Sequence, residues 1–297
     1  ARALVGPENS WVTVLRARWR RAPSPPFRRP VVVGFQDIFV AGDHVTFWTT
    51  HTPIALEGID ASLFMYMQDK GMSTSGRSML PDGGAWLIVE FGGESKEEAD
   101  AQARGLMQAF RATDSPPSMK LFDDEDEERQ LWKIRESGLG STSKIPHDPD
   151  FYPGWEDSAV APKDVGNYLR DLYALFQKYD YTASLYGHFG QGCIHCSIDF
   201  DLYTQQGIEQ WKSFLNEAAH LVTSYGGSLS GEHGDGQARG TLLPLLFGNE
   251  IIGPFPEVKA LSDPGGKGKP GRATDACTAG GDRRWCTPNR PARPAGP

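Results

Sequence analysis

The sequence predicts an α+β fold in which helices cover one face of an antiparallel sheet. Two features of the 297-residue chain support this prediction. Short apolar segments that suit strands are separated by amphipathic segments that suit helices, and two strand segments follow each other around a glycine-rich turn. The length is sufficient for one large domain or two ordinary domains, each with an apolar core.

Several segments have the composition of buried or half-buried strands. Residues 85–91 (AWLIVEF) are expected to form a central strand. The other expected strands are residues 31–35, 54–59, 181–186 and 194–200. Residues 11–20 alternate apolar and polar side chains only in part, which suits an edge strand.

The expected helices begin near residues that favour a helix N-terminus. Ser95 is expected to start a helix that continues to Phe110, with Glu97 and Glu98 in its first turn. Asp43 is expected near the start of a helix over residues 42–52. A helix over residues 62–71 is expected with Ser62 as its cap, and another from the solvated acidic run 123–128 through Arg135. Two more helices are expected over residues 163–179 and 208–225, and Gly226 and Gly227 are expected to end the second of these.

Composition marks two boundaries along the chain. Pro23, Pro25 and Pro26 interrupt the strand pattern and are expected to separate two domains. From Asp263 the composition changes, and residues 277–297 are rich in arginine, proline, glycine and alanine without periodicity, so we expect a disordered tail. We hypothesise that this tail is the product of a shifted reading frame, and that a chain beginning at Ala1 is a fragment or a processed product.

Charge and apolar content exclude several classes of protein. The net charge of −8 and the pI near 5.4 argue against a nucleic-acid partner, because nucleic-acid binders usually carry basic patches. The sequence contains neither a signal peptide nor an apolar run of about 18 residues that could form a transmembrane segment. Four cysteines do not make a disulfide scaffold in a chain of this length, and a reducing cytoplasm is expected.

Two glycine-rich motifs contain the residue types of a catalytic metal site. The first, GHFGQGCIH, contains His188 and His195, and the second, GEHGDG, contains Glu232 and His233. Glycine lets the backbone approach a ligand closely, and imidazole with carboxylate suits a divalent metal such as zinc, manganese or iron. The spacing indicates His188, His195 and Glu232 as candidate metal ligands, and His233 as a group that could transfer protons near neutral pH.

Other interpretations of these residues remain open. Cys193 and Cys196 could bind a structural zinc with Cys277 and Cys286, although two residues three apart on a strand point to opposite faces. The order Gly-x-x-Gly-x-Gly is the reverse of the dinucleotide-binding fingerprint, so we reject a nicotinamide cofactor. Arg135 is either a helix-surface arginine paired with a neighbouring glutamate or a bidentate clamp for a substrate carboxylate.

The strings WKIRES, GHFGQGCIH and GGSLSGEHGDGQARG resemble motifs of a known family. The chain, from Ala1 to about Gly271, is similar to the C-terminal, substrate-side part of the FAD-linked oxidases of the vanillyl-alcohol-oxidase superfamily. The branch with the greatest similarity contains D-lactate dehydrogenases, glycolate oxidase large subunits and D-2-hydroxyglutarate dehydrogenases. In this family an FAD-binding domain precedes an antiparallel α+β cap that resembles a ferredoxin fold.

The resemblance implies a division of the chain into three parts. Residues 1–22 would be the end of an FAD-binding domain, residues 23–272 the substrate and metal domain, and residues 273–297 the tail. Two motifs near the flavin differ from the family pattern. Gly6-Pro7-Glu8-Asn9-Ser10 stands where the family has Gly-Thr-Glu-Gly-Thr, and Lys269-Pro270-Gly271 where it has Asn-Pro-Gly. This chain alone is therefore not expected to hold FAD.

The resemblance also implies site roles. The family binds a divalent metal, commonly zinc, at the positions of His188, His195 and Glu232, uses the position of His233 as the base, and places the position of Arg135 near the substrate carboxylate. A 2-hydroxy acid would thus be oxidised by hydride transfer to FAD, and a quinone, a cytochrome or an iron–sulfur module would take the electrons.

Two functions of other classes stay open beside the oxidoreductase. The chain could be a non-catalytic remnant, or a metal-dependent hydrolase with Glu232 or His233 as its base. We expect a cytoplasmic location or a peripheral position at the inner membrane.

Overall fold

The structure, a computed structural model, describes residues 15–18, 20, 24–49, 51–69, 77–136, 151–268, 274 and 276. The predictions for residues 6–10, for 269–271 and for the tail from 277 to 297 lie outside these residues. Within the predicted edge strand 11–20, the described residues 15–18 and 20 lie in no strand, so that prediction is wrong for them. Their apolar side chains do not alternate strictly, and no partner strand lies beside them within the described chain.

The described residues form a seven-stranded antiparallel sheet in the order β4-β1-β3-β2-β6-β7-β5. The strands are β1 (Phe27–Phe35), β2 (Ala55–Asp60), β3 (Ala85–Gly93), β4 (Ser118–Leu121), β5 (Ser158–Ala159), β6 (Ala183–His188) and β7 (Cys193–Ile198). The predicted α+β class and the five predicted internal strands are confirmed. The two short strands β4 and β5 were not predicted, because four and two residues are too few to show a period.

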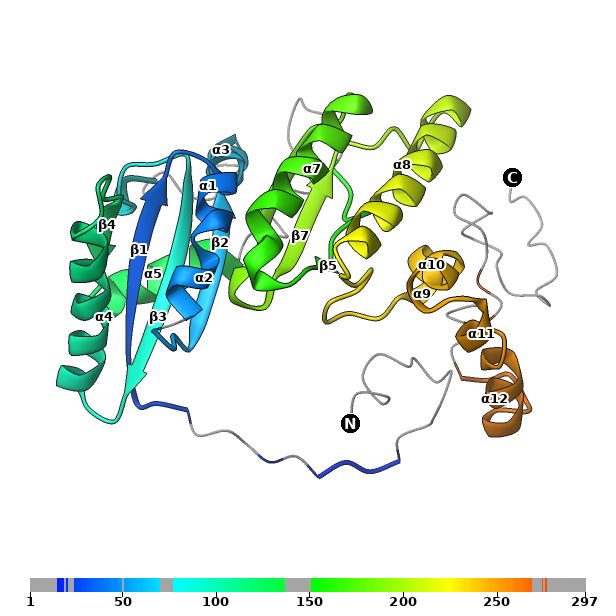
Figure 1. Ribbon diagram of the computed structural model, residues 1–297, viewed down its shortest axis with the longest axis horizontal. Coiled ribbons are helices and arrows are strands. Elements are labelled where there is room, and N and C mark those ends of the chain that lie inside the picture. Colours follow the sequence, from blue (N-terminus) through cyan, green and yellow to red (C-terminus); the bar gives the residue numbers. More distant parts are fainter. Residues whose placement is uncertain are drawn as a thin grey trace, which may run out of the picture.

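Helices lie between successive strands along the chain, except between β6 and β7, which form a hairpin (Figure 1). Those between or directly after the strands are α1 (Ile38–Asp43), α2 (Val45–Thr49), α3 (Ala61–Asp69), α4 (Lys96–Arg111), α5 (Glu125–Glu136), α7 (Val165–Lys178) and α8 (Gln205–Ser224). Four short helices follow: α9 (Gly236–Arg239), α10 (Leu243–Phe247), α11 (Asn249–Ile252) and α12 (Phe255–Ser262). No helix of the described chain combines the length and the apolar character that crossing a bilayer requires.

The predicted start of the helix at residues 42–52 is wrong. Helix α1 begins four residues earlier, because the side chain of Asp37 accepts a hydrogen bond from the backbone N–H of Val40 and caps the helix. Asp43 is the last residue of α1, where it forms an ion pair with Arg170 of α7. A turn at His44 separates α1 from α2.

The remaining helix signals are largely confirmed, except for the predicted cap Ser62. Helix α3 begins one residue earlier, at Ala61, and the side chain of Asp60 accepts the N–H of Ser62 at 3.1 Å. The Ser95 side chain accepts a hydrogen bond from the N–H of Glu98 at 3.2 Å and starts α4. After α8, Gly226 takes a positive φ of 65°, which favours glycine. The acidic run begins α5 as predicted, but it is not fully solvated, because Glu128 forms an ion pair with Arg29 at 2.7 Å.

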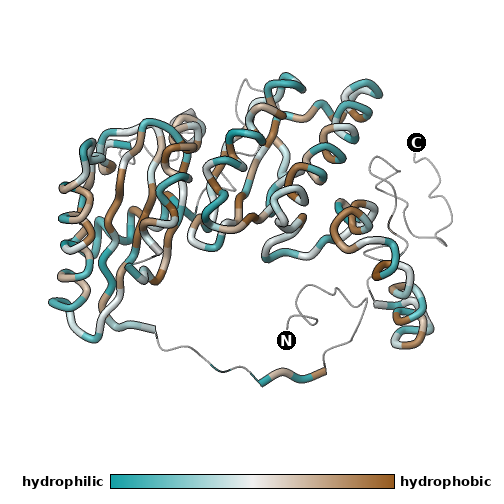
Figure 2. Tube along the Cα trace, in the orientation of Figure 1, coloured by the Kyte–Doolittle hydropathy of each residue, from teal (hydrophilic) through white to brown (hydrophobic). Residues whose placement is uncertain are grey.

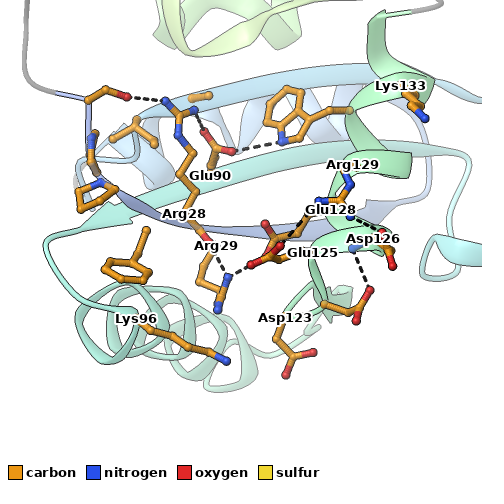
Figure 3. Close-up of a pocket in the computed structure, with 18 of the residues that line it drawn as sticks. Arg28, Arg29, Glu90, Lys96, Asp123, Glu125, Asp126, Glu128, Arg129 and Lys133 are labelled. Carbon is orange, nitrogen blue, oxygen red and sulfur yellow. Dashed lines mark hydrogen bonds and ion pairs between the residues drawn. The ribbon is translucent and has the colours of Figure 1, made fainter.

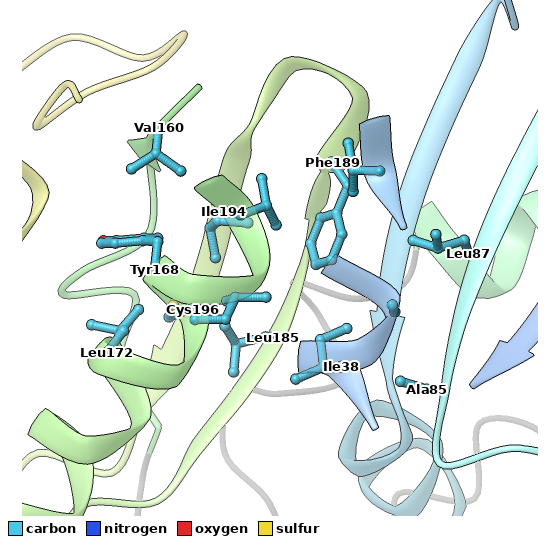
Figure 4. Close-up of a cluster of buried hydrophobic side chains, with 14 of the residues drawn as sticks. Ile38, Ala85, Leu87, Val160, Tyr168, Leu172, Leu185, Phe189, Ile194 and Cys196 are labelled. Carbon is cyan, nitrogen blue, oxygen red and sulfur yellow. The ribbon is translucent and has the colours of Figure 1, made fainter. Parts of the chain in front are cut away.

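The sheet has two unlike faces. We call the first the helix face: it carries Val31, Val33, Leu87, Val89, Leu185 and Ile194, and it packs against α1, α2, α4, α7 and α8. Figure 4 shows this cluster around Phe189, Leu185 and Ile38. Figure 2 shows the matching apolar stretches along the central strands.

We call the opposite side the site face. It carries Val32, Trp86 and Ile88 next to Leu63 of α3 and Leu131 of α5. The prediction that helices lie on one face therefore holds for the larger helical layer, whereas α3 and α5 cover part of the other face. Successive side chains of each strand point to opposite faces of the sheet, so each face can be apolar where helices cover it.

Candidate functional site

The hairpin of β6 and β7 places two predicted ligands on the site face. Residues 189–191 form a single 3₁₀ turn, and Gly192 follows with a φ of 74°. In register, His188 lies opposite Cys193, and Tyr186 lies opposite His195. Paired residues share a face of the sheet, and the centroids of the His188 and His195 rings lie 5.4 Å apart.

The loop with Glu232 and His233 is held against this hairpin by a buried carboxylate. Asp157 is fully buried and accepts hydrogen bonds from the backbone N–H groups of Glu232 at 3.2 Å and of His233 at 2.8 Å. It also accepts the hydroxyl of Ser230 at 2.8 Å. Because a carboxylate offers several lone pairs, one side chain can fix the backbone of the whole turn.

The four predicted residues of the two motifs come together at one atom. The Oε1 atom of Glu232 lies 3.4 Å from Nε2 of His188 and 3.3 Å from Nε2 of His195. The same oxygen lies 3.4 Å from Nε2 of His233. The structure therefore brings together residues that the sequence separates by up to 45 positions, counting from 188 to 233.

The other ring nitrogen of each histidine faces an oxygen atom. Nδ1 of His188 lies 2.8 Å from Oε1 of Glu57, and Nδ1 of His233 lies 3.2 Å from Oε1 of Glu156. Nδ1 of His195 donates to the backbone carbonyl of Glu156. Carboxylate and carbonyl oxygens accept hydrogen bonds, and the Nδ1 contacts are shorter than the contacts of 3.3–3.4 Å between Nε2 and Glu232, so we assign the proton of each neutral ring to Nδ1 and the lone pair to Nε2.

Two carboxylates keep their charge beside these rings. Burial acts to raise the pKa of Glu57, but the hydrogen bond with His188 and the charge of Arg135 outweigh it, and the pKa lies below its ordinary value. Burial likewise opposes the effect of His195 and His233 on Glu156, whose pKa falls to about 2. Both glutamates are therefore anionic hydrogen-bond acceptors at neutral pH.

The same carboxylate–histidine pairs shift the pKa values of the histidines. The hydrogen bond to Glu57 raises the pKa of His188, and burial only partly offsets it. Burial lowers the pKa of His233, but the hydrogen bond and the charge of Glu156 outweigh burial and raise it above its ordinary value. Each of these rings is thus polarised by a carboxylate at Nδ1.

Arg135 is not the surface arginine that one sequence interpretation proposed, paired with Glu128 or Glu136. Its side chain is 11% exposed, and its Nε and Nη2 atoms lie 2.8 and 2.7 Å from Oε2 of Glu57. Its guanidinium also lies over the ring of Tyr186, 4.7 Å from the centroid. The sequence alone could not predict this pairing, because Glu57 is 78 residues away.

A second set of potential ligands overlaps the predicted one. Asp157, Cys193, His195 and Glu232 each place one ligand atom within 4.8 Å of the others, a set that does not contain His188. Asp157 already accepts three hydrogen bonds from the Glu232 loop, and burial raises the pKa of the Cys193 thiol. Two members of this set are thus already engaged with other groups, whereas the Nε2 atoms of His188 and His195 both face the carboxylate of Glu232.

The two cysteines of the hairpin lie on opposite faces, as expected from their spacing. Cys193 lies beside Asp157 on the site face, and Cys196 is part of the helix-face core. Cys277 and Cys286, the other members of the alternative zinc site, lie outside the described residues.

Sequence reasoning missed the carboxylates that orient the histidines. Glu57 lies in β2 (sequence ALEGID), and Glu156 and Asp157 follow Trp155 in a segment without a strong period. One signal was available: a glutamate within an otherwise apolar strand is rarely buried without a partner. Glu57 and Glu90 both fit that rule, and both are paired with an arginine.

A large open cavity adjoins this site on the same face. It has a volume of about 1380 Å³ and lies between the start of β1, the start of β2, the end of β3 and helix α5 (Figure 3). Glu57 is part of its lining, whereas His188, His195, Glu232 and His233 are not. Charged side chains of both signs surround it, including Arg28 and Glu90, which form an ion pair at 2.7 Å.

Comparison with known proteins identifies the relatives of this chain. The sequence profile of the family described as FAD linked oxidases, C-terminal domain, matches residues 24–273. A D-2-hydroxyglutarate dehydrogenase of Pseudomonas putida is 25% identical over 96% of this chain and 28% of its own length. The glycolate oxidase subunit GlcD of Bacillus subtilis is 23% identical over 91% of this chain and 56% of its own length.

The fold is also similar to a solved structure. The crystal structure of p-cresol methylhydroxylase with substrate bound matches 84% of this chain and 53% of that chain, with a TM-score of 0.59 and 12% identity. The chain thus spans about a quarter to a half of the length of the relatives named here. The resemblance to FAD-linked oxidases is confirmed by the family match and by the fold.

Proposed function

Because this chain belongs to the C-terminal domain family of FAD-linked oxidases, we propose that it forms the substrate side of a flavin-dependent oxidoreductase acting on a small 2-hydroxy acid. The relatives are a D-2-hydroxyglutarate dehydrogenase and a glycolate oxidase subunit, and both named substrates have a hydroxyl group beside a carboxylate. The observation that carries the proposal is the convergence of three imidazole nitrogens on one oxygen of Glu232.

We assign a divalent cation, zinc, to His188, His195 and Glu232, because the carboxylate oxygen faces the imidazole nitrogen of each histidine. Tetrahedral zinc bonds of about 2.0–2.1 Å separate neighbouring ligand atoms by about 3.3 Å. The distances from Glu232 Oε1 to the Nε2 atoms of His188 and His195 are 3.4 and 3.3 Å. Since these nitrogens carry lone pairs rather than protons in the neutral rings, a cation between them and the carboxylate is stabilised by all three groups.

Within this proposal the cation would polarise the substrate hydroxyl group, and the flavin would accept the hydride. His233 takes the hydroxyl proton at Nε2, because this nitrogen is free in the neutral ring and the side chain is 49% exposed. Glu156 holds Nδ1 of His233 at 3.2 Å, so it keeps the ring in place and stabilises the positive charge that the proton brings.

Arg135 is the group that we assign to the substrate carboxylate. Its contacts to Glu57 use Nε and Nη2, so Nη1 is the atom that would bind the carboxylate. The ring of Tyr186 lies under the guanidinium and limits its rotation. Arg135 and the histidines lie on the same face of β2, β6 and β7, because Glu57 contacts both groups.

The test is a spectroscopic titration of the full-length gene product with glycolate, D-lactate and D-2-hydroxyglutarate, each with zinc present or removed by a chelator. We expect one of these acids to bleach the flavin absorbance only when the metal is present, and the L-enantiomer of a chiral acid to be inactive. A product that contains metal but no flavin and hydrolyses esters would favour the hydrolase. A product that neither binds metal nor reacts with any of these acids would favour the interpretation of the chain as a non-catalytic remnant.

A further inference from the structure

Glu57 contacts two parts of the candidate site that lie on different elements. Its side chain is 8% exposed and projects from the central strand β2 onto the site face. Its Oε1 atom lies 2.8 Å from Nδ1 of His188 on β6, and its Oε2 atom lies 2.8 and 2.7 Å from Nε and Nη2 of Arg135 on α5. Each oxygen has its own partner, so both contacts form at once.

We infer that Glu57 is a positioning residue that ties the metal ligand His188 to the substrate-binding Arg135. This inference rests on the function proposed above. Glu57 fixes the proton of His188 on Nδ1, so that Nε2 is left as a metal ligand. The Oε2 atom of the same carboxylate accepts from both Nε and Nη2 of Arg135, and these two contacts fix the orientation of the guanidinium and so the direction in which Nη1 points.

A carboxylate is required for both contacts, and an amide cannot replace it. Both partners of Glu57 are N–H donors, and glutamine has only one oxygen, because its other terminal atom is itself a donor. If the amide nitrogen faces His188, the ring must move its proton to Nε2 to accept that hydrogen bond, and the metal loses a lone pair. If the amide nitrogen faces Arg135, a donor opposes a buried cation, so we expect the amide nitrogen to face His188.

The neighbouring strand contains a matched control. Glu90 on β3 is buried on the same face, and its register partner Ala55 lies two residues before Glu57. Its Oε2 accepts from Arg28 at 2.7 Å, and its Oε1 accepts from the ring N–H of Trp132 at 3.2 Å. Glu90 thus repeats the pattern of Glu57, with one arginine and one ring N–H donor, but its ring partner is an indole rather than a candidate metal ligand.

The experiment compares zinc affinity in the wild type, E57Q and E90Q, measured on the 297-residue chain by competition with a chelating indicator. We expect E57Q to weaken zinc binding about 10- to 100-fold, the usual effect of removing a group that orients a metal ligand, and E90Q to bind zinc like the wild type. Equal zinc affinities of E57Q and the wild type would refute the role of Glu57. A wild type that binds no divalent metal would instead refute the metal site of the proposed function.

A tautomer measurement separates positioning from a general structural role. In the metal-free wild type at a pH where His188 is neutral, ¹⁵N chemical shifts should report a proton on Nδ1 of His188. In E57Q we expect the proton on Nε2, or a mixture of the two tautomers, whereas E90Q should retain Nδ1. An unchanged tautomer in E57Q would contradict the inference even if zinc binding fell.

A second variant covers the case in which E57Q does not fold, since that substitution leaves Arg135 buried without its anion. The double variant E57L/R135M removes both charges and leaves Nδ1 of His188 without its acceptor, so we expect it to fold and to lose zinc affinity as E57Q does. R135M alone keeps Glu57 beside His188, so it should bind zinc as the wild type does. Normal zinc binding by the double variant would overturn the inference.

Discussion

The two faces of the β6–β7 hairpin are built from the same twelve residues and serve opposite purposes. On the helix face, Leu185 and Ile194 are completely buried under helices in a continuous apolar core. On the site face, the alternate residues include His188 and His195, whose ring nitrogens contact carboxylate and carbonyl oxygens. One face therefore stabilises the fold through packing, whereas the other uses that stability to hold polar groups in place.

The comparison shows why the polar face can be tolerated. Buried charges and imidazoles cost free energy unless hydrogen bonds satisfy them. Here the carboxylates of Glu57 and Asp157 each accept from two or more donors, that of Glu156 accepts from His233, and every candidate ligand histidine has an acceptor at Nδ1. The helix face supplies the rigid strands on which this network is built.

The first prediction tests the stabilising role of the helix face. Ile194→Ala should lower the free energy of unfolding by about 2–5 kcal/mol, because it removes a buried side chain and leaves a cavity. Chemical denaturation measures this loss. Zinc affinity of the folded variant should stay near the wild-type value, since Ile194 points away from the histidines. A loss of only about 0.5 kcal/mol, as for a surface residue, would show that packing on the helix face does not stabilise the fold.

The second prediction removes a ligand from the site face. Glu232→Gln should abolish zinc binding and turnover together, because the oxygen that faces three histidines loses its charge. Zinc at about 100 times its dissociation constant should stabilise the wild type by ~2.7 kcal/mol, and this stabilisation should vanish in the variant. Thermal unfolding with and without zinc measures the difference. A variant that retains metal and activity would remove Glu232 from the ligand set.

The third prediction separates the base from the ligands. His233→Asn should keep the metal but reduce turnover at least ~100-fold, because the group that accepts the substrate proton is lost. Metal content and steady-state rates of the full-length product give the two quantities. Nε2 of His233 lies as close to Glu232 as the corresponding atom of His188 does, so loss of metal in this variant would identify His233 as a ligand instead.

The smallest expected effect concerns a helix end on the helix face. Ser95→Ala should lower the free energy of unfolding by about 1 kcal/mol, because the side chain no longer accepts the N–H of Glu98 at the start of α4. Zinc affinity should not change. Ser95→Asp is the control, since aspartate also caps a helix and should restore most of the stability. If Ser95→Ala changed zinc affinity, the stability of the helix face and the geometry of the site would be coupled, and the two faces would not act separately.

Local signals in the sequence were sufficient for most of the secondary structure. Ser95 and Gly226 mark the ends of α4 and α8 through interactions within a few residues, so both could be predicted. The start of α1 was missed although Asp37 is a standard cap, because Asp43 offered a competing signal nearby. Strands β4 and β5 could not be predicted, since short strands are recognised only by the partner strand beside them.

The sequence by itself determined that His188, His195, Glu232 and His233 are candidate site residues, because glycine-rich turns and residue type are properties of short segments. Only the tertiary structure decided which groups orient them. Glu57 is 131 residues from His188, and Glu156 is 77 residues from His233. The physical reason is that a hydrogen bond depends on distance in space, and strand pairing brings together residues whose separation along the chain has no period.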